Sequence, residues 1–143
     1  MKYIISIIAL VIFTFEYSHA QRSSDTDSPP LFVYDILFEL GNAVILEDSY
    51  SDLDSLFTFL VSNPTIAIEI GNHCDERASS YYSNKLTGVR AKAIGKYLIQ
   101  RGIQSKRIET KGYEDTQPVI KNAKSEVEHS KNRRTEIRVL SLR

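Results

Sequence analysis

A chain of 143 residues with 18 basic and 18 acidic side chains has no net charge at neutral pH. This balance argues against a general binder of nucleic acid or other polyanions, although the last third of the chain is locally basic. Cys74 is the only cysteine, so no internal disulfide can form and the core of one ordinary domain must supply the stability.

The first 20 residues have the pattern of a secretory signal peptide. Lys2 precedes an apolar run of roughly thirteen residues, and the segment ends at Ser18-His19-Ala20. The run is shorter than the roughly twenty residues of a spanning helix, so we expect cleavage before Gln21, with an uncleaved anchor as the alternative. Residues 21–30 are polar and rich in proline, which predicts a disordered linker. The mature chain is therefore expected to be periplasmic, with no transmembrane segment.

Hydrophobic periodicity then predicts alternating strands and helices over 31–143. Strands are expected at 31–40, 65–71, 107–113 and 134–142, and helices at 51–62, 84–101 and, briefly, 125–130. In the first helix the apolar stripe is expected to contain Leu53, Leu56, Phe57 and Leu60. In the second helix it is expected to contain Leu86, Val89, Ala93 and Tyr97, widened by Ile94 and Leu98. This order predicts an α+β sandwich with the helices on one face of the sheet.

His73, Cys74 and Asp75 together contain the residue types of a nucleophilic triad. Neighbouring side chains at a strand end point in alternating directions, so His73 and Cys74 are not expected to meet. A zinc site would need three or four ligands at recognisable spacing, and no CxxC or HxxxH motif is present. We therefore disfavour both catalysis and metal binding, and interpret Cys74 as a partly buried filler.

Asp75 and Arg90 form a second candidate constellation. Asp75 follows the expected strand at 65–71, and Arg90 lies about two turns into a helix that begins near Asn84. A carboxylate can accept an ammonium group and a guanidinium can hold a carboxylate, so the two could recognise a zwitterion. Two simpler interpretations stay open, namely that the two residues pair with each other or that Arg90 is solvated.

Several ordered motifs resemble the OmpA-like peptidoglycan-binding domain, which also occurs in peptidoglycan-associated lipoproteins and flagellar stator proteins. The matching segments are ILFELGNAVI at 36–45, IGNHCD at 70–75, the Tyr82 to Ala91 segment with its Asn84, Leu86, Thr87 and Arg90, KGY at 111–113 and NRRTEI at 132–137. The resemblance covers about 31–143. It implies a βαβαββ two-layer sandwich with helices packed on a mixed four-stranded sheet.

The resemblance also implies a function. It implies non-covalent binding of peptidoglycan through the diaminopimelate of its stem peptide, with no reaction catalysed and no cofactor. By position, Asp75 would accept the ammonium of diaminopimelate and Arg90 would hold its carboxylate. Asn84 and Thr87 would shape the loop and helix start, His73 would border the pocket, and Arg134 would support the site or anchor the last strand.

The chain also departs from the family pattern. Asn72 stands where the family usually has glycine, and Cys74 replaces a threonine. The alternative function is therefore an envelope adaptor that keeps the fold but acts through protein contacts, with residues 121–134 as its candidate surface. An outer-membrane or other envelope protein partner is expected in either case.

Overall fold

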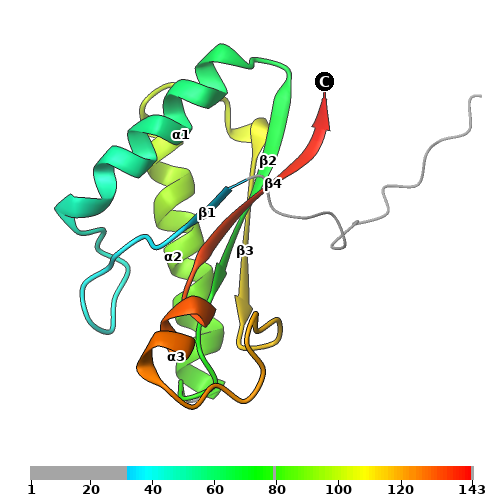
Figure 1. Ribbon diagram of the computed structural model, residues 1–143. Helices are drawn as coiled ribbons and strands as arrows, with labels where there is room; N and C mark the ends of the chain where they lie inside the picture. The colour runs from blue at the N-terminus through cyan, green and yellow to red at the C-terminus, as the bar shows by residue number, and fades with distance from the viewer. Residues whose placement is uncertain (1–31, 79, 143) are drawn as a thin grey trace, which may run out of the picture.

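The computed structural model describes residues 32–78 and 80–142, and within that range the side chains of residues 80–84 and 141–142 lie outside the description. The expected signal peptide and linker also lie outside the described residues. In chain order the elements are β1 (Phe32–Tyr34), a 3-10 turn (Glu47–Ser49), α1 (Tyr50–Ser62), β2 (Ile66–His73), α2 (Ser80–Gln100), a second 3-10 turn (Ser105–Arg107), β3 (Ile108–Glu114), α3 (Glu126–Asn132) and β4 (Thr135–Leu142). Figure 1 shows their arrangement.

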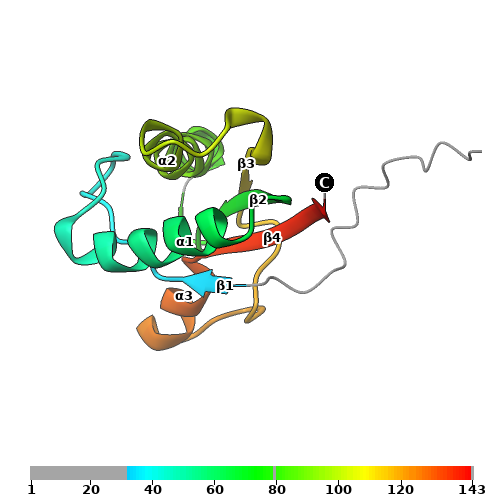
Figure 2. The same cartoon turned by 90° about the horizontal axis from the view of Figure 1, so that it is seen from above.

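The four strands form one mixed sheet in the order β1-β4-β2-β3. β2 runs parallel to β3, and β4 lies antiparallel between β2 and β1. The long helices α1 and α2 cover one face of this sheet (Figure 2), and the opposite face turns away from them. The predicted α+β sandwich is confirmed.

The first strand is much shorter than expected. β1 ends at Tyr34, and the remainder of the predicted strand turns away to make a single antiparallel bridge between Phe38 and Ile45. Ser49 explains part of this path, because its hydroxyl accepts a hydrogen bond from Leu37 N at 2.7 Å. The alternating apolar residues of the predicted strand therefore belong to two structures. The first lie in the edge strand β1, and Ile36 and Phe38 lie in a loop that packs against the core.

The core lies between the sheet and the two long helices. α1 contributes Leu53, Leu56 and Leu60, as its periodicity predicted, and each is at most 1% exposed. Ile68 and Ile70 of β2 face them from the sheet and are fully buried. Burial of a side chain of this size contributes about 1.5–3 kcal/mol.

The predicted stripe of α2 is correct in part. Ile94 and Leu98 are fully buried as expected, and Tyr97 packs against the core, but Val89 is 46% exposed and Ala91 is fully buried in its place. Small residues explain the difference, because α2 packs on β3 through glycine: a Cβ on Gly95 would lie 2.9 Å from Thr110 Cγ2. A search for large apolar residues overlooks such a contact surface.

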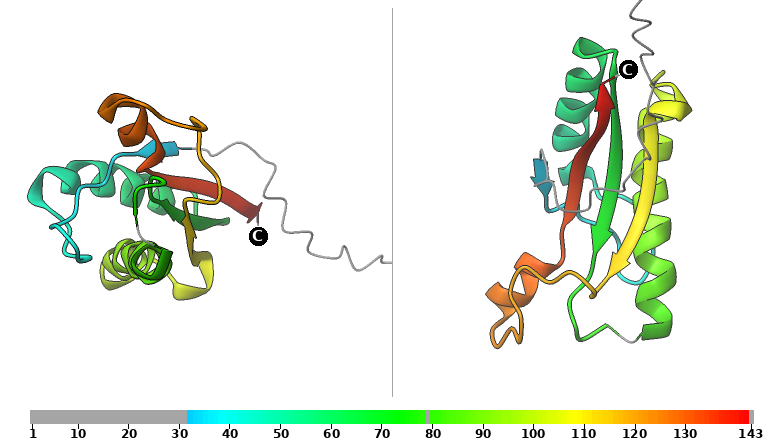
Figure 3. Two further views of the ribbon diagram at one scale, coloured as in Figure 1. Left: turned by 90° about the horizontal axis from the view of Figure 1, so that it is seen from below. Right: turned by 90° about the vertical axis from the view of Figure 1, so that its right-hand side faces the viewer.

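The carboxyl ends of β2 and β3 meet the start of β4 at one end of the sheet. The loop into α2 and the short helix α3 lie at this same end, as Figure 3 (right) shows. His73 N donates to Arg134 O, and Cys74 N donates to Glu114 O, each at 2.9 Å, which fixes the three strand ends to one another. In the part of the chain that the structure describes, no helix has the length and apolar character required to cross a membrane.

Candidate functional site

Asp75 is positioned by the turn that follows β2. Its side chain is only 7% exposed. The Oδ1 atom accepts a hydrogen bond from Arg77 N at 2.9 Å, and Ala78 N donates to the Asp75 carbonyl at 3.2 Å. Such a turn fixes the direction of the carboxylate, because the aspartate side chain is bonded to its own loop.

Two arginines and a second acid surround Asp75. Arg77 Nη2 lies 3.0 Å and Arg133 Nη1 lies 2.6 Å from Asp75 Oδ2. The same two guanidiniums reach Glu126, at 2.9 Å from Arg77 and 2.6 Å from Arg133. We call this arrangement of Asp75, Arg77, Glu126 and Arg133 the ion-pair ring. It joins the loop after β2 to the first turn of α3.

The ion-pair ring keeps Asp75 ionised. Burial alone would raise the pKa of this carboxyl, but hydrogen bonds from Arg77 and Arg133 outweigh it and hold the pKa far below the usual 3.8. Asp75 is therefore a carboxylate at neutral pH.

Arg90 lies on α2, further from the helix start than expected because the helix begins at Ser80. Its Nε donates to Asn42 O at 3.0 Å and its Nη2 to Glu39 O at 3.4 Å, while the guanidinium lies 4.7 Å from the centre of the Phe38 ring. Burial lowers the pKa of Arg90, and nearby Cys74 acts in the opposite direction. Among the described residues, Nη1 has no hydrogen-bond partner.

Asp75 and Arg90 do not pair with each other. Asp75 takes Arg77 and Arg133 as partners, and Arg90 is held by the carbonyls of the 39–42 loop. A pocket of about 270 Å³ is lined by Arg90 but not by Asp75. Its lining includes Asp35, Phe38, Asn72, His73, Arg90, Arg133 and Arg134. Arg133 belongs both to this pocket and to the ion-pair ring, so it links Asp75 to the pocket that Arg90 lines.

His73 borders this pocket from the strand end. Its ring stacks on Tyr113 with centroids 4.8 Å apart, and its Nε2 lies 3.5 Å from Glu136 Oε2. Burial lowers the pKa of His73, and the attraction of Glu136 only partly offsets it, so the imidazole is neutral at pH 7. The buried, uncharged ring of His73 thus forms part of the pocket lining.

The other proposed site residues lie at different depths. Thr87 is 2% exposed and packs against β3, because a Cβ on Gly112 would lie 2.5 Å from Thr87 Oγ1. Asn84 lies in the first part of α2, but its side chain is outside the described residues. Arg134 donates to Glu136 Oε1 through Nε at 2.7 Å and to Gln117 O at 3.0 Å. These contacts anchor the last strand and the loop before α3.

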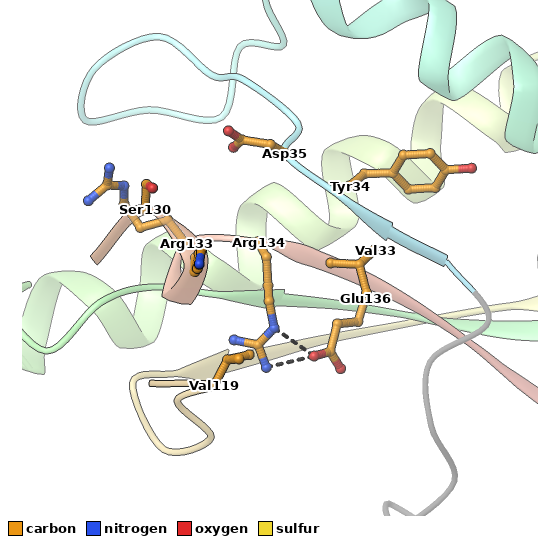
Figure 4. Close-up of a pocket in the computed structure, with 9 residues that line it drawn as sticks. Val33, Tyr34, Asp35, Val119, Ser130, Arg133, Arg134 and Glu136 are labelled. Carbon is orange, nitrogen blue, oxygen red and sulfur yellow. Dashed lines mark hydrogen bonds and ion pairs between the residues drawn. The ribbon is translucent and has the colours of Figure 1, made fainter. Parts of the chain in front are cut away.

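A second hollow of about 600 Å³ adjoins the first on the sheet face away from α1 and α2. It shares Asp35, Arg133 and Arg134 with the smaller pocket and adds the apolar side chains of Val33 and Val119. In Figure 4 the guanidinium of Arg134 reaches across to Glu136 rather than into open space.

Sequence reasoning missed Arg133, and strand alternation could have found it. Arg133 has extended backbone just before β4, so it shares a face with Thr135 and Ile137, and Ile137 is fully buried. Arg134 then points to the opposite face with Glu136. Arg77 gave no comparable signal, because its contact with Asp75 depends on a loop turn.

Comparison with known protein families identifies the family of this chain. A family model described as OmpA family matches residues 37–133. The chain belongs to the OmpA family. The resemblance seen in the sequence motifs is thereby confirmed.

Individual relatives are similar over the same region. The chain is 31% identical over 105 residues to outer membrane porin F of Pseudomonas fluorescens, covering 73% of this chain and 32% of the porin. It is 33% identical over 84 residues to a peptidoglycan-associated lipoprotein of Rhizobium meliloti, covering 59% of this chain and 48% of that protein. The chain thus spans about a third of the porin and about half of the lipoprotein.

A solved structure shares the fold. The peptidoglycan-associated lipoprotein from Burkholderia pseudomallei superposes with a TM-score of 0.65 at 22% identity, covering 83% of this chain and 99% of that one. At this level of identity the likeness concerns the arrangement of strands and helices.

Proposed function

We propose that this OmpA-family domain binds peptidoglycan non-covalently through the diaminopimelate of the stem peptide, without catalysing a reaction. One observation carries the proposal: the ionised, buried carboxylate of Asp75 is bound by Arg133, and Arg133 together with Arg90 lines the smaller pocket. The names of the lipoprotein relatives, which refer to association with peptidoglycan, support the same function.

The side-chain end of diaminopimelate offers an ammonium and a carboxylate group. Asp75 would accept the ammonium. Arg90 would donate Nη1 to the carboxylate, because its other two nitrogens already bind the 39–42 loop. Fixing a guanidinium before the ligand arrives reduces the entropy lost on binding. Arg133 would keep Asp75 in place, and His73 would close one wall of the pocket.

The proposed location is the periplasm after removal of the first 20 residues, with anchoring of the envelope as the role. The proposed partner is an outer-membrane or other envelope protein, which would connect the wall-bound domain to the rest of the envelope. The Lys121–Arg134 segment contributes Glu126 and Arg133 to the ion-pair ring, so its position is coupled to the pocket.

Co-sedimentation with purified sacculi tests the proposal. Asp75→Asn and Arg90→Ala should each weaken binding about 30-fold or more, because loss of one partner in a buried charge contact costs about 2–5 kcal/mol. Lys106→Ala is the matched control, since this exposed lysine at the opposite end of the sheet also loses one positive charge. Its binding should equal that of the wild type.

Circular dichroism and thermal melting of each variant show whether the fold is intact. Wild-type protein that stays in the supernatant at low and moderate salt would rule out wall binding. Full binding by both folded pocket variants would show that the ligand lies elsewhere on the surface.

A further inference from the structure

Arg77 already occupies the position on Asp75 that a ligand's ammonium group would need. Its Nε donates to Oδ1 at 3.1 Å and its Nη2 to Oδ2 at 3.0 Å. A guanidinium in this place makes the same kind of charge-assisted hydrogen bond as an ammonium group. We infer that Arg77 is an internal competitor for the ammonium site of Asp75, an inference that rests on the proposed function.

The ion-pair ring lets Arg77 leave Asp75 without losing every partner. The Arg77 side chain is 49% exposed, whereas that of Asp75 is 7% exposed. Glu126, which is 65% exposed, holds Arg77 Nη1 at 2.9 Å. When an ammonium group reaches Asp75, Arg77 can therefore remain bound to Glu126 at the surface. Glu126 is the acid that keeps the competitor close to the site.

Arg133 has a different part in the ring. It contacts Asp75 at 2.6 Å through Nη1 and also lines the pocket, which Arg77 does not. It binds Oδ2 alone, so the Oδ1 side of Asp75 becomes free when the Arg77 side chain moves. Arg133 therefore holds the carboxylate in place for the ligand, and Arg77 blocks it.

An internal competitor weakens ligand binding because only the molecules with an open site can bind. The apparent affinity equals the intrinsic affinity multiplied by the fraction of molecules in which Asp75 is free of Arg77. The Arg77 contact is bidentate but half-exposed, so solvent and salt weaken it. Arg77→Ala should therefore bind meso-diaminopimelate about threefold to fivefold more tightly than the wild type. Arg77→Lys keeps the positive charge but loses the two-pronged geometry, so its affinity should lie between the two.

Titration calorimetry of the purified protein with meso-diaminopimelate measures this difference, with Lys106→Ala as the control for loss of one positive charge. Tighter binding by Arg77→Ala than by both the wild type and the control supports the competitor. Binding by Arg77→Ala alone supports it more strongly. Equal or weaker binding by Arg77→Ala, with wild-type binding intact, overturns the competitor and leaves the proposed function standing.

If neither the wild type nor Arg77→Ala binds, the proposed function fails, and the competitor fails with it because an opened Asp75 then takes no ammonium. A nuclear magnetic resonance titration gives a second readout in the wild type. The Arg77 Nε–H resonance should move on addition of diaminopimelate as its bond to Asp75 breaks. An unchanged Arg77 resonance at saturating ligand would overturn the inference.

Discussion

At the scale of single residues, Glu136 in β4 is a buried charge with several cationic neighbours. It is 4% exposed, accepts hydrogen bonds from Arg134 and Arg138, and lies 3.5 Å from His73. Burial raises the pKa of Glu136, but the contacts with His73 and Arg134 outweigh it and lower the pKa to about 2. The carboxylate binds both Arg134 and Arg138, so its loss leaves two largely buried guanidinium groups without this counter-charge.

Glu136→Gln should therefore change how stability depends on pH. A depressed pKa contributes stability that is present above the usual value of 4.5 and is lost as the pH falls toward about 2. At pH 7 the variant should be about 3 kcal/mol less stable. Between about pH 4.5 and about pH 2 its stability should fall less steeply than that of the wild type.

Urea unfolding at a series of pH values measures both effects. Parallel pH curves for the wild type and Glu136→Gln would show that Glu136 titrates normally in the folded protein. Asp75 is present in both proteins, so its contribution to acid unfolding cancels in the comparison.

At the scale of elements, the contact between α2 and β3 depends on small residues. A Cβ on Gly112 of β3 would lie 2.5 Å from Gly88 N and from Thr87 Oγ1, so the strand backbone touches the helix there. Gly88 is different, since a Cβ on it would meet nothing within 4 Å. The close approach therefore requires glycine on the strand side only.

Substitution of these two glycines should have opposite effects. Gly88→Ala should raise the free energy of unfolding by about 0.5–1 kcal/mol, because alanine has the higher helix propensity and space is available. Gly112→Ala should lower it by about 1–3 kcal/mol, because the added methyl group would push helix and strand apart. Chemical denaturation of both variants checks the signs. A stabilised Gly112→Ala would show that the helix can shift without cost.

The same contact explains which elements sequence reasoning could predict. α1 follows a stripe of leucines, and its buried face agreed with the prediction. The buried face of α2 contains the predicted Ile94 and Leu98, but it also rests on Ala91 and Gly95, so the prediction that Val89 is buried was wrong. In the site, Asp75 and Arg90 could be proposed from motif spacing, whereas the ion-pair ring depends on how a loop turn and the start of α3 meet in space.

At the scale of the whole molecule, Arg107 secures the end of the sheet opposite the pocket. It is 9% exposed and donates to the carbonyls of Leu60, Asn63 and Ile66 at 2.7–2.9 Å. It thus joins the end of α1 and the start of β2 to the turn before β3. A cation at the carboxyl end of a helix also interacts favourably with the helix dipole.

Arg107→Met should destabilise the protein while leaving the pocket chemistry intact. Methionine keeps the apolar part of the side chain but removes the Arg107 donors from the carbonyls of Leu60, Asn63 and Ile66, which costs about 1–3 kcal/mol. The midpoint of thermal unfolding should fall, whereas diaminopimelate affinity at a temperature well below that midpoint should stay unchanged. A large loss of affinity in the folded variant would mean that the two ends of the sheet are coupled.

The position of β4 has a consequence for the time course of folding. The strand nearest the carboxyl end of the chain lies between β1 and β2, and Phe32 pairs with Ile137 across most of the described sequence. β2, α2 and β3 are neighbours in sequence and can associate early, but the sheet is incomplete until residues 135–142 are available. Pairings this distant in sequence slow folding. A nascent chain is therefore expected to expose the β2 edge until synthesis of the domain is finished, and to acquire its native sheet in one late step.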